Sequence, residues 1–230
     1  MKNLVSVLVP AHNEEKRIGA VLDTLLESPD VDEVICINDG SKDKTEEICK
    51  SKKGVTLISL EKNYGKAYAI VQGIQKAKGE IILFVDADLI GLTVENIHDL
   101  VAPLEEKTYE VSIGYRTAVI DRIMFMPLAG ERAYFKKDLL PHTEKIKNKG
   151  YGIELYLNYV FKDKQIKLLG LKGVKHMMKH NKQKYNVAFK GFVFEIGDLM
   201  KEIFRQDNPI RFFINSYLYS FYIKQKKQKK

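Results

Sequence analysis

The sequence predicts an α/β fold in which a mostly parallel central sheet is covered by helices on both faces. Three observations support this prediction. Strand-like and helix-like segments alternate four times along the chain. The strand-like segments are almost wholly apolar, which is typical of strands that are buried on both faces. Polar residues follow the first four strands, at the sheet edge where folds of this kind bind their ligands.

The first half of this pattern contains three strands and two helices. Residues 4–9 read as a buried strand, and residues 34–37 and 55–60 read as the next two. Asp43, followed by Glu46 three residues later, predicts a capping box at the start of the second helix. The first helix is indicated by an apolar stripe at helical spacing, which consists of Ile18, Val21, Leu22, Leu25 and Leu26.

The second half repeats the pattern. Residues 80–85, EIILFV, read as a fourth buried strand, and residues 109–114 as a fifth. Thr93 can cap the helix between them. The helix before the fourth strand has its apolar stripe at Ala67, Ile70, Val71, Ile74 and Ala77, and the helix after it at Ile97, Leu100, Val101 and Leu104.

The alternation fades beyond residue 116. We expect one main domain over residues 1–185, followed by a helical extension with a basic tail over residues 186–230. The expected elements are a loop at 117–128 with an apolar patch, helices at 130–140 and 152–161, a short strand at 165–170, and one or two helices within 186–223.

The net charge of +8 suggests an anionic partner. Five of these charges belong to the C-terminal KQKKQKK, and without them the net charge is +3. A nucleic-acid partner therefore receives little support from charge, and none is expected.

Cys36 and Cys49 lack the spacing of a metal site, and we expect two buried thiols in a reducing compartment. No signal peptide is apparent, and no apolar run reaches the roughly 18 residues of a membrane-spanning helix. We expect a cytoplasmic protein, with peripheral contact at the inner membrane face left open.

Three common phosphate-binding patterns are missing. No G-x-G-x-x-G follows the first strand, and the Gly65-Lys66 pair lacks the other residues of a P-loop. The first strand is also not followed by the glycine-rich, basic loop that many nucleotidyltransferases use.

Asp86 and Asp88 follow the fourth strand directly. In an extended segment these two carboxylates would point to the same side, about 6–7 Å apart. Such a pair suits one Mg²⁺ or Mn²⁺ ion that bridges to a diphosphate. A turn at the end of the strand is the alternative interpretation.

Four segments, in their order and spacing, resemble the family 2 glycosyltransferases with the GT-A fold. They are VSVLVPAHNEEKRI, NDGSKDKT, KNYGKAYAI and FVDADL, within residues 4–90. A looser resemblance continues through residues 128–132, 151–154 and 173–176. These later segments are more similar to the branch that contains glucosyl-3-phosphoglycerate synthases and polyprenyl-phosphate sugar transferases. The Q-x-x-R-W signature of cellulose and chitin synthases is absent, and the chain has no tryptophan.

The resemblance implies a role for each matching position. Pro10, Ala11 and Glu14 resemble the residues that contact the uridine and the ribose. Asp39 resembles the acid that hydrogen-bonds the base, and Lys66 resembles the cation beside the nucleotide. Asp86 resembles a residue near the ribose and metal-bound water, Asp88 resembles the direct metal ligand, and His176 resembles a further metal ligand. His180 is chemically an equal alternative to His176. The alternative interpretation of Glu14 is a structural one, in which its negative charge interacts favourably with the dipole at the start of a helix. The alternative for Lys66 is a solvated helix start, where its positive charge would interact unfavourably with the dipole. The implied cofactor is Mg²⁺ or Mn²⁺.

Glu154 resembles the acid that this family places at the start of a helix facing the sugar, and Glu131 is its rival as catalytic base. An inverting transfer to a hydroxyl needs such a base. An anionic acceptor needs no strong base, and a retaining transfer would not use one in this role.

The implied reaction moves a sugar from a nucleotide-diphospho-sugar to an acceptor. A UDP-sugar is the first expectation, because Asp39 accepting a base N–H suits uracil or guanine better than adenine.

The acceptor is left open between a phosphorylated small molecule and a lipid phosphate. Whether the chain forms a homodimer is also left open. The apolar loop and the aromatic, lysine-tailed C-terminus suit a membrane surface, but we favour ordinary core packing.

The other class of function is a catalytically silent domain that binds a nucleotide sugar or a protein. The complete set of Asp39, Lys66, Asp86 and Asp88 argues against it.

Overall fold

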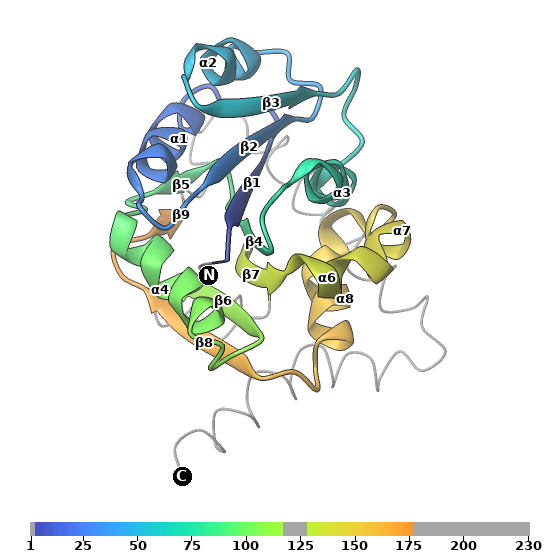
Figure 1. Cartoon of the computed structure of the whole chain (residues 1–230). Helices are drawn as coiled ribbons and strands as arrows, with labels where there is room; N and C mark the ends of the chain where they lie inside the picture. The colour runs from blue at the N-terminus through green and yellow to red at the C-terminus, as the bar shows by residue number, and fades with distance from the viewer. Residues whose placement is uncertain (1–2, 117–127, 177–230) are drawn as a thin grey trace.

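The computed structural model describes residues 3–116 and 128–176, which form a seven-stranded mixed sheet with helices on both faces (Figure 1). The predicted boundary at residue 185, the apolar residues 124–127 and the expected helices beyond residue 185 lie outside the described residues. Within the described ranges, none of the helices is long and apolar enough to cross a membrane.

The large sheet has the strand order β3-β2-β1-β4-β7-β6-β8. β7 runs antiparallel to both of its neighbours, and all other adjacent pairs are parallel. A second, two-stranded antiparallel sheet pairs β5 with β9. The strands are β1 Val5–Ala11, β2 Glu33–Asn38, β3 Val55–Ser59, β4 Ile81–Phe84, β5 Leu89–Ile90, β6 Val111–Arg116, β7 Glu131–Phe135, β8 Ile166–Leu171 and β9 Lys175–His176.

Two groups of helices cover the two faces of the sheet, as Figure 1 shows. One group comprises α1 Ile18–Glu27, α2 Thr45–Ser51 and α4 Val94–Glu105. The other comprises α3 Lys66–Lys76, α6 Lys136–Leu139, α7 Thr143–Ile146 and α8 Ile153–Val160, with the 3₁₀ turns η2 Leu140–His142 and η3 Gly150–Gly152. Most residues of the predicted apolar stripes are buried against the sheet, and this burial is what stabilises the amphipathic helices.

The prediction of a helix over residues 130–140 is wrong in its first half. Residues Glu131–Phe135 form β7, which fills the position between β4 and β6, and only Lys136–Leu139 are helical. Ala133 and Tyr134 are buried in opposite cores, one on each face of the sheet. Pairing with two neighbouring strands therefore overrides the helical preference of this polar segment.

The predicted capping box at α2 is also wrong. The N-cap residue is Lys44, which makes no side-chain cap. Asp43 lies one residue earlier, where its Oδ1 accepts the Thr45 N–H at 3.0 Å, and Glu46 Oε1 accepts from the Ser59 hydroxyl at 3.0 Å. By contrast, the Thr93 cap of α4 is confirmed, because its hydroxyl accepts the backbone N–H of Asn96 at 3.3 Å.

Candidate functional site

The loops that follow β1 and β2 are hydrogen-bonded to each other at the carboxyl edge of the sheet. Ala11 O accepts the backbone N–H of Asp39 at 2.8 Å, and His12 Nδ1 lies 2.7 Å from Asp39 O. Glu14 donates its backbone N–H to Thr45 Oγ1 at 2.8 Å. These bonds place Pro10 and Ala11, the last two residues of β1, beside the loop that carries Asp39. The predicted convergence of these two strand ends is confirmed.

Glu14 does not lie in a regular helix, because α1 begins only at Ile18. Its carbonyl accepts the N–H groups of Arg17 and Ile18, each at 3.0 Å. Its carboxylate accepts from Arg17 Nη1 at 2.9 Å. Glu14 therefore closes the turn that leads into α1, and a nucleotide contact for it remains a prediction.

Asp39 joins the loop after β2 to the loop between β3 and α3. Its side chain is buried, with only 3% of the residue exposed. Oδ1 accepts the backbone N–H of Tyr64 at 2.7 Å, and Oδ2 accepts that of Gly65 at 2.8 Å. Both amides directly precede Lys66, so Asp39 holds the start of α3 in place. This structural role was not foreseen, and each carboxylate oxygen keeps further lone-pair capacity for a ligand.

Gly40 lets these two loops approach closely. Its φ is +63°, and a Cβ at this position would lie 2.4 Å from the carbonyl carbon of Lys62. Glycine adopts this φ without strain, and only glycine has no Cβ to fill this space.

Lys66 is the first residue of α3 and connects two acids from distant parts of the chain. Its Nζ lies 2.7 Å from Asp86 Oδ1 and 2.9 Å from Glu154 Oε1. Burial by itself would lower the pKa of Lys66, but the carboxylates of Asp86 and Glu154 more than offset this, and the pKa lies above its ordinary value. The two acids also offset the unfavourable helix dipole at this position. The sequence predicted a cation here, but not its pairing with Glu154.

Asp86 and Asp88 do not lie in an extended segment. β4 ends at Phe84, and Ala87 and Asp88 form a turn. The strand alternation that we expected to direct both carboxylates to one side is therefore absent. Both acids are half-buried. Gly130 packs directly against Asp86, since a Cβ on Gly130 would lie 2.4 Å from Asp86 Oδ2.

The two candidate bases differ in their surroundings. Glu154 is buried in the first turn of α8 and is ion-paired with Lys66. Glu131 is the first residue of β7, is also buried, and pairs in the strand register with Gly114. The structure thus places Glu154 in one cluster with Lys66 and Asp86, and a catalytic role for either acid remains a prediction.

Arg132 is a residue that the sequence analysis missed. It follows Glu131 in β7 and is only 1% exposed. Its guanidinium donates to Ala129 O and, through Nη1, to Asn158 Oδ1 at 2.7 Å. Arginine is typical of the protein surface, so the residue type gave no reason to expect burial. The one signal in the sequence was its place in residues 128–132, part of the looser family resemblance.

His176 approaches the carboxylate pair through its backbone. β9 pairs antiparallel with β5, and His176 lies opposite Leu89, the residue after Asp88. Gly91, with φ +76°, supports this pairing, because a Cβ there would lie 2.5 Å from Gly173 O. The backbone therefore brings residues 173–176 beside residues 88–91. His180 lies outside the described residues.

A divalent ion remains a prediction for this site. Across residues 3–116 and 128–176, no group of three or more His, Cys, Asp or Glu side chains is arranged to hold a metal. Mg²⁺ commonly uses only one or two protein carboxylates and completes its shell with water and substrate phosphate. Asp86 and Asp88 supply the type of donor that this mode of binding uses, in which most ligands come with the substrate.

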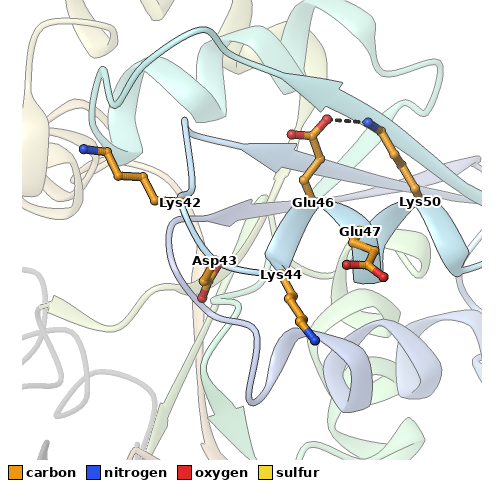
Figure 2. Close-up of a pocket in the computed structure, with 6 residues that line it drawn as sticks. All are labelled: Lys42, Asp43, Lys44, Glu46, Glu47 and Lys50. Atoms are coloured by element: carbon orange, nitrogen blue, oxygen red, sulfur yellow. Dashed lines mark ion pairs between the residues drawn. The ribbon is translucent and has the colours of Figure 1, made fainter.

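A surface hollow of about 540 Å³ lies beside α2 (Figure 2). Glu46 and Lys50 form an ion pair of 2.6 Å within it. The six side chains that line it are all charged: Lys42, Asp43, Lys44, Glu46, Glu47 and Lys50. None of them is a predicted site residue, so this hollow is distinct from the cluster around Lys66.

Comparison with known proteins gives a family match over most of the chain. The family model described as "Glycosyl transferase family 2" matches residues 6–164. A curated relative, the 4,4'-diaponeurosporenoate glycosyltransferase of Staphylococcus aureus, is 36% identical over 102 residues. That match covers 42% of this chain and 27% of the relative, so the chain spans only about a quarter of that protein's length.

Solved structures of glucosyl-3-phosphoglycerate synthase from Mycobacterium tuberculosis are similar in fold. The complex with Mn²⁺, UDP and glucosyl-3-phosphoglycerate has a TM-score of 0.65 at 23% identity, covering 84% of this chain and 78% of that one. The complex with Mg²⁺ and UDP has a TM-score of 0.65 at 23% identity, covering 86% and 80%. At this identity the likeness concerns the fold, and it confirms the predicted GT-A fold.

Proposed function

This chain belongs to glycosyl transferase family 2, and from that premise we propose that it transfers a sugar from a nucleotide-diphospho-sugar to an acceptor. The observation that carries the proposal is the cluster of Lys66 with Asp86 and Glu154. A lysine and two carboxylates from three separate parts of the chain meet at the edge of the sheet where α/β folds bind ligands. Burying such charges is costly, so a cluster of this kind suits a functional site better than a merely structural one.

The donor would bind along the loops that Asp39 holds together. Asp39 would accept an N–H of the base, Pro10 and Ala11 would contact the uridine through their backbone, and Glu14 would contact the ribose. Asp86 would lie near the ribose, and Lys66 beside the diphosphate. A UDP-sugar is the first candidate donor. The solved structures of similar fold contain UDP, which agrees with this choice.

Asp88 and Asp86 would hold Mg²⁺ or Mn²⁺, with His176 as a further ligand. When bound, such an ion would neutralise charge on the leaving diphosphate. The chain's own part is then to hold Asp86 in place through Gly130 and Lys66, and to keep the loop before Lys66 fixed through Asp39. The structures of similar fold contain Mn²⁺ or Mg²⁺.

Glu154 is the better candidate for an acid that acts on the sugar or the acceptor. If the acceptor reacts through a hydroxyl in an inverting transfer, Glu154 would accept its proton. Glu131 is the second candidate for this role. The acceptor would be either a phosphorylated small molecule or a lipid phosphate. A cytoplasmic location, peripheral membrane contact and a homodimer remain predictions.

A panel of UDP-, GDP- and ADP-sugars, assayed for nucleoside diphosphate release with Mn²⁺, tests the proposal. We expect release from a UDP-sugar that stops when the metal is chelated. Lys66→Met should reduce the rate by about 10²-fold or more, because it removes a preorganised charge at the site. Lys62→Met is the matched control, since Lys62 lies four residues away, with its ammonium over the Tyr64 ring.

Two results would contradict the proposal. One is the absence of release from every donor, which would favour a silent binding domain. The other is full activity of Asp88→Asn in chelator-treated buffer, which would show that the reaction does not need a metal ion.

A further inference from the structure

Arg132 is an unusual residue to find inside the sheet. It lies in β7 opposite Phe84 of β4 and Ile113 of β6, and it is only 1% exposed. A buried guanidinium is costly unless its donors are satisfied. An apolar side chain at this position of the strand would avoid that cost. The contacts of Arg132 therefore indicate what its burial achieves.

The two sides of the guanidinium contact two different parts of the chain. Nε donates to the carbonyl of Ala129. Nη1 donates to Asn158 Oδ1 at 2.7 Å and lies 3.4 Å from the backbone carbonyl of Glu154, both in α8. The planar guanidinium has a fixed fork of donors, which suits a link between the segment before β7 and α8 better than the single head of a lysine.

Each of these parts of the chain carries or supports one of the acids that share Lys66. Ala129 is followed by Gly130, whose Cα packs against the Asp86 carboxylate. Glu154 and Asn158 are four residues apart in α8 and therefore share one face of the helix. Anchoring Asn158 consequently sets the rotation of α8 about its axis, and this rotation directs Glu154 toward Lys66.

We propose that Arg132 is a positioning residue, which holds the segment beside Asp86 and the first turn of α8 at the separation that lets both acids reach Lys66. The residue acts on the reaction only through these acids, so its value for catalysis rests on the function proposed above. Its effect on the geometry around Lys66 can be measured without any substrate.

The accessibility of Lys66 to an amine-acylating reagent, followed by mass spectrometry, provides that measurement. In the wild-type protein both carboxylates hold the ammonium, so labelling of Lys66 should be slow. Arg132→Met should release α8 and raise the labelling rate of Lys66 several-fold. Lys52 serves as an internal reference, because it pairs with Asp23 at 2.6 Å between α1 and the end of α2.

Tyr134→Phe is the matched control. It removes a hydroxyl 3.3 Å from Arg132 Nη1 and leaves the contacts to Ala129, Glu154 and Asn158 in place. Labelling of Lys66 should stay at the wild-type rate. Arg132→Lys retains the charge without the fork, and it should give a rate between those of the wild type and Arg132→Met.

If Arg132→Met does not fold, Asn158→Ala replaces it, because this change removes one acceptor and leaves Arg132 in the sheet. An unchanged Lys66 rate in a folded variant would overturn the proposal. An equal rise for Lys66 and Lys52 would also overturn it, because it would show a general loss of stability.

Once a donor is known, the turnover number of Arg132→Met should fall with little change in KM. A wild-type protein that releases no nucleotide would refute the proposed function, while the labelling result would still decide the role of Arg132.

Discussion

Gly130 packs its Cα directly against the carboxylate of Asp86, so that a Cβ at this position would lie 2.4 Å from Oδ2. The two residues belong to different segments, one after β4 and one before β7. The contact leaves room at residue 130 for hydrogen alone, and it holds the carboxylate that Lys66 contacts from α3.

Gly130→Ala should therefore move the Asp86 carboxylate while leaving the fold intact. Because a displacement of about 1 Å can cost roughly 10²-fold in rate, we expect a loss of that order in nucleotide release. Titration calorimetry with UDP and Mn²⁺ should show weaker binding. Gly19→Ala in α1 is the control, since its Cβ would lie 3.5 Å from Ile48 Cγ2, an ordinary contact. Equal activity of the two variants would contradict this prediction.

Asp39→Asn should reduce both stability and nucleotide binding. An amide side chain has one acceptor oxygen and would present its N–H₂ group to one of the Tyr64 and Gly65 amides. Leaving a buried donor unsatisfied costs about 1–3 kcal/mol, which thermal or urea unfolding can detect.

Asp32→Asn provides the comparison for Asp39. Asp32 Oδ2 accepts the backbone N–H of Val5 at 2.8 Å, at the opposite end of the sheet. This variant should leave UDP binding unchanged whatever its effect on stability. Loss of UDP binding in both variants would show that stability, and not the loop before Lys66, governs the effect.

His142 should make the stability of the protein depend on pH. Burial lowers the pKa of His142, Lys145 lowers it further, and Asp138 acts in the opposite direction. The folded protein therefore binds this proton less readily than the unfolded chain. The free energy of unfolding should be highest above the ordinary pKa of about 6.5 and should fall as the pH drops through the lower folded value.

Urea unfolding at a series of pH values measures this effect. His142→Gln should flatten the part of the profile just below pH 6.5. The same slope in wild type and variant would assign the pH dependence to other groups.

Cys36 and Cys49 should be unreactive toward a thiol reagent in the folded protein. Their Sγ atoms share a hydrogen bond at 2.8 Å, and both residues are buried. The hydrogen bond to Cys49 and burial both raise the pKa of Cys36, so its reactive thiolate is scarce. The same hydrogen bond lowers the pKa of Cys49, so it is burial that shields this second thiol from the reagent. Ellman's reagent should release two equivalents of chromophore only after unfolding. Rapid reaction under native conditions would contradict the observed burial.

The first four strands and the helices between them could be predicted because their signal is local. Apolar residues repeat with a period near two or 3.6, and these periods are properties of the strand and the helix themselves. The same reasoning placed Asp39, Lys66 and Asp86 at one edge of the sheet, because parallel strands bring their carboxyl ends together. The contact between Lys66 and Asp86 and the hydrogen bonds between Asp39 and the loop before Lys66 agree with this placement.

The remaining features depend on partners that are distant in the sequence. β7 is a strand because a position between β4 and β6 buries Ala133 and Tyr134 in opposite cores, although the segment itself has helix-forming residues. Glu154 meets Lys66 across 88 residues of chain, and no local pattern encodes such a pair. Arg132 looks like a surface residue in the sequence and is buried in the structure. Its environment is set by the free energy of packing the whole sheet, which only the tertiary structure decides.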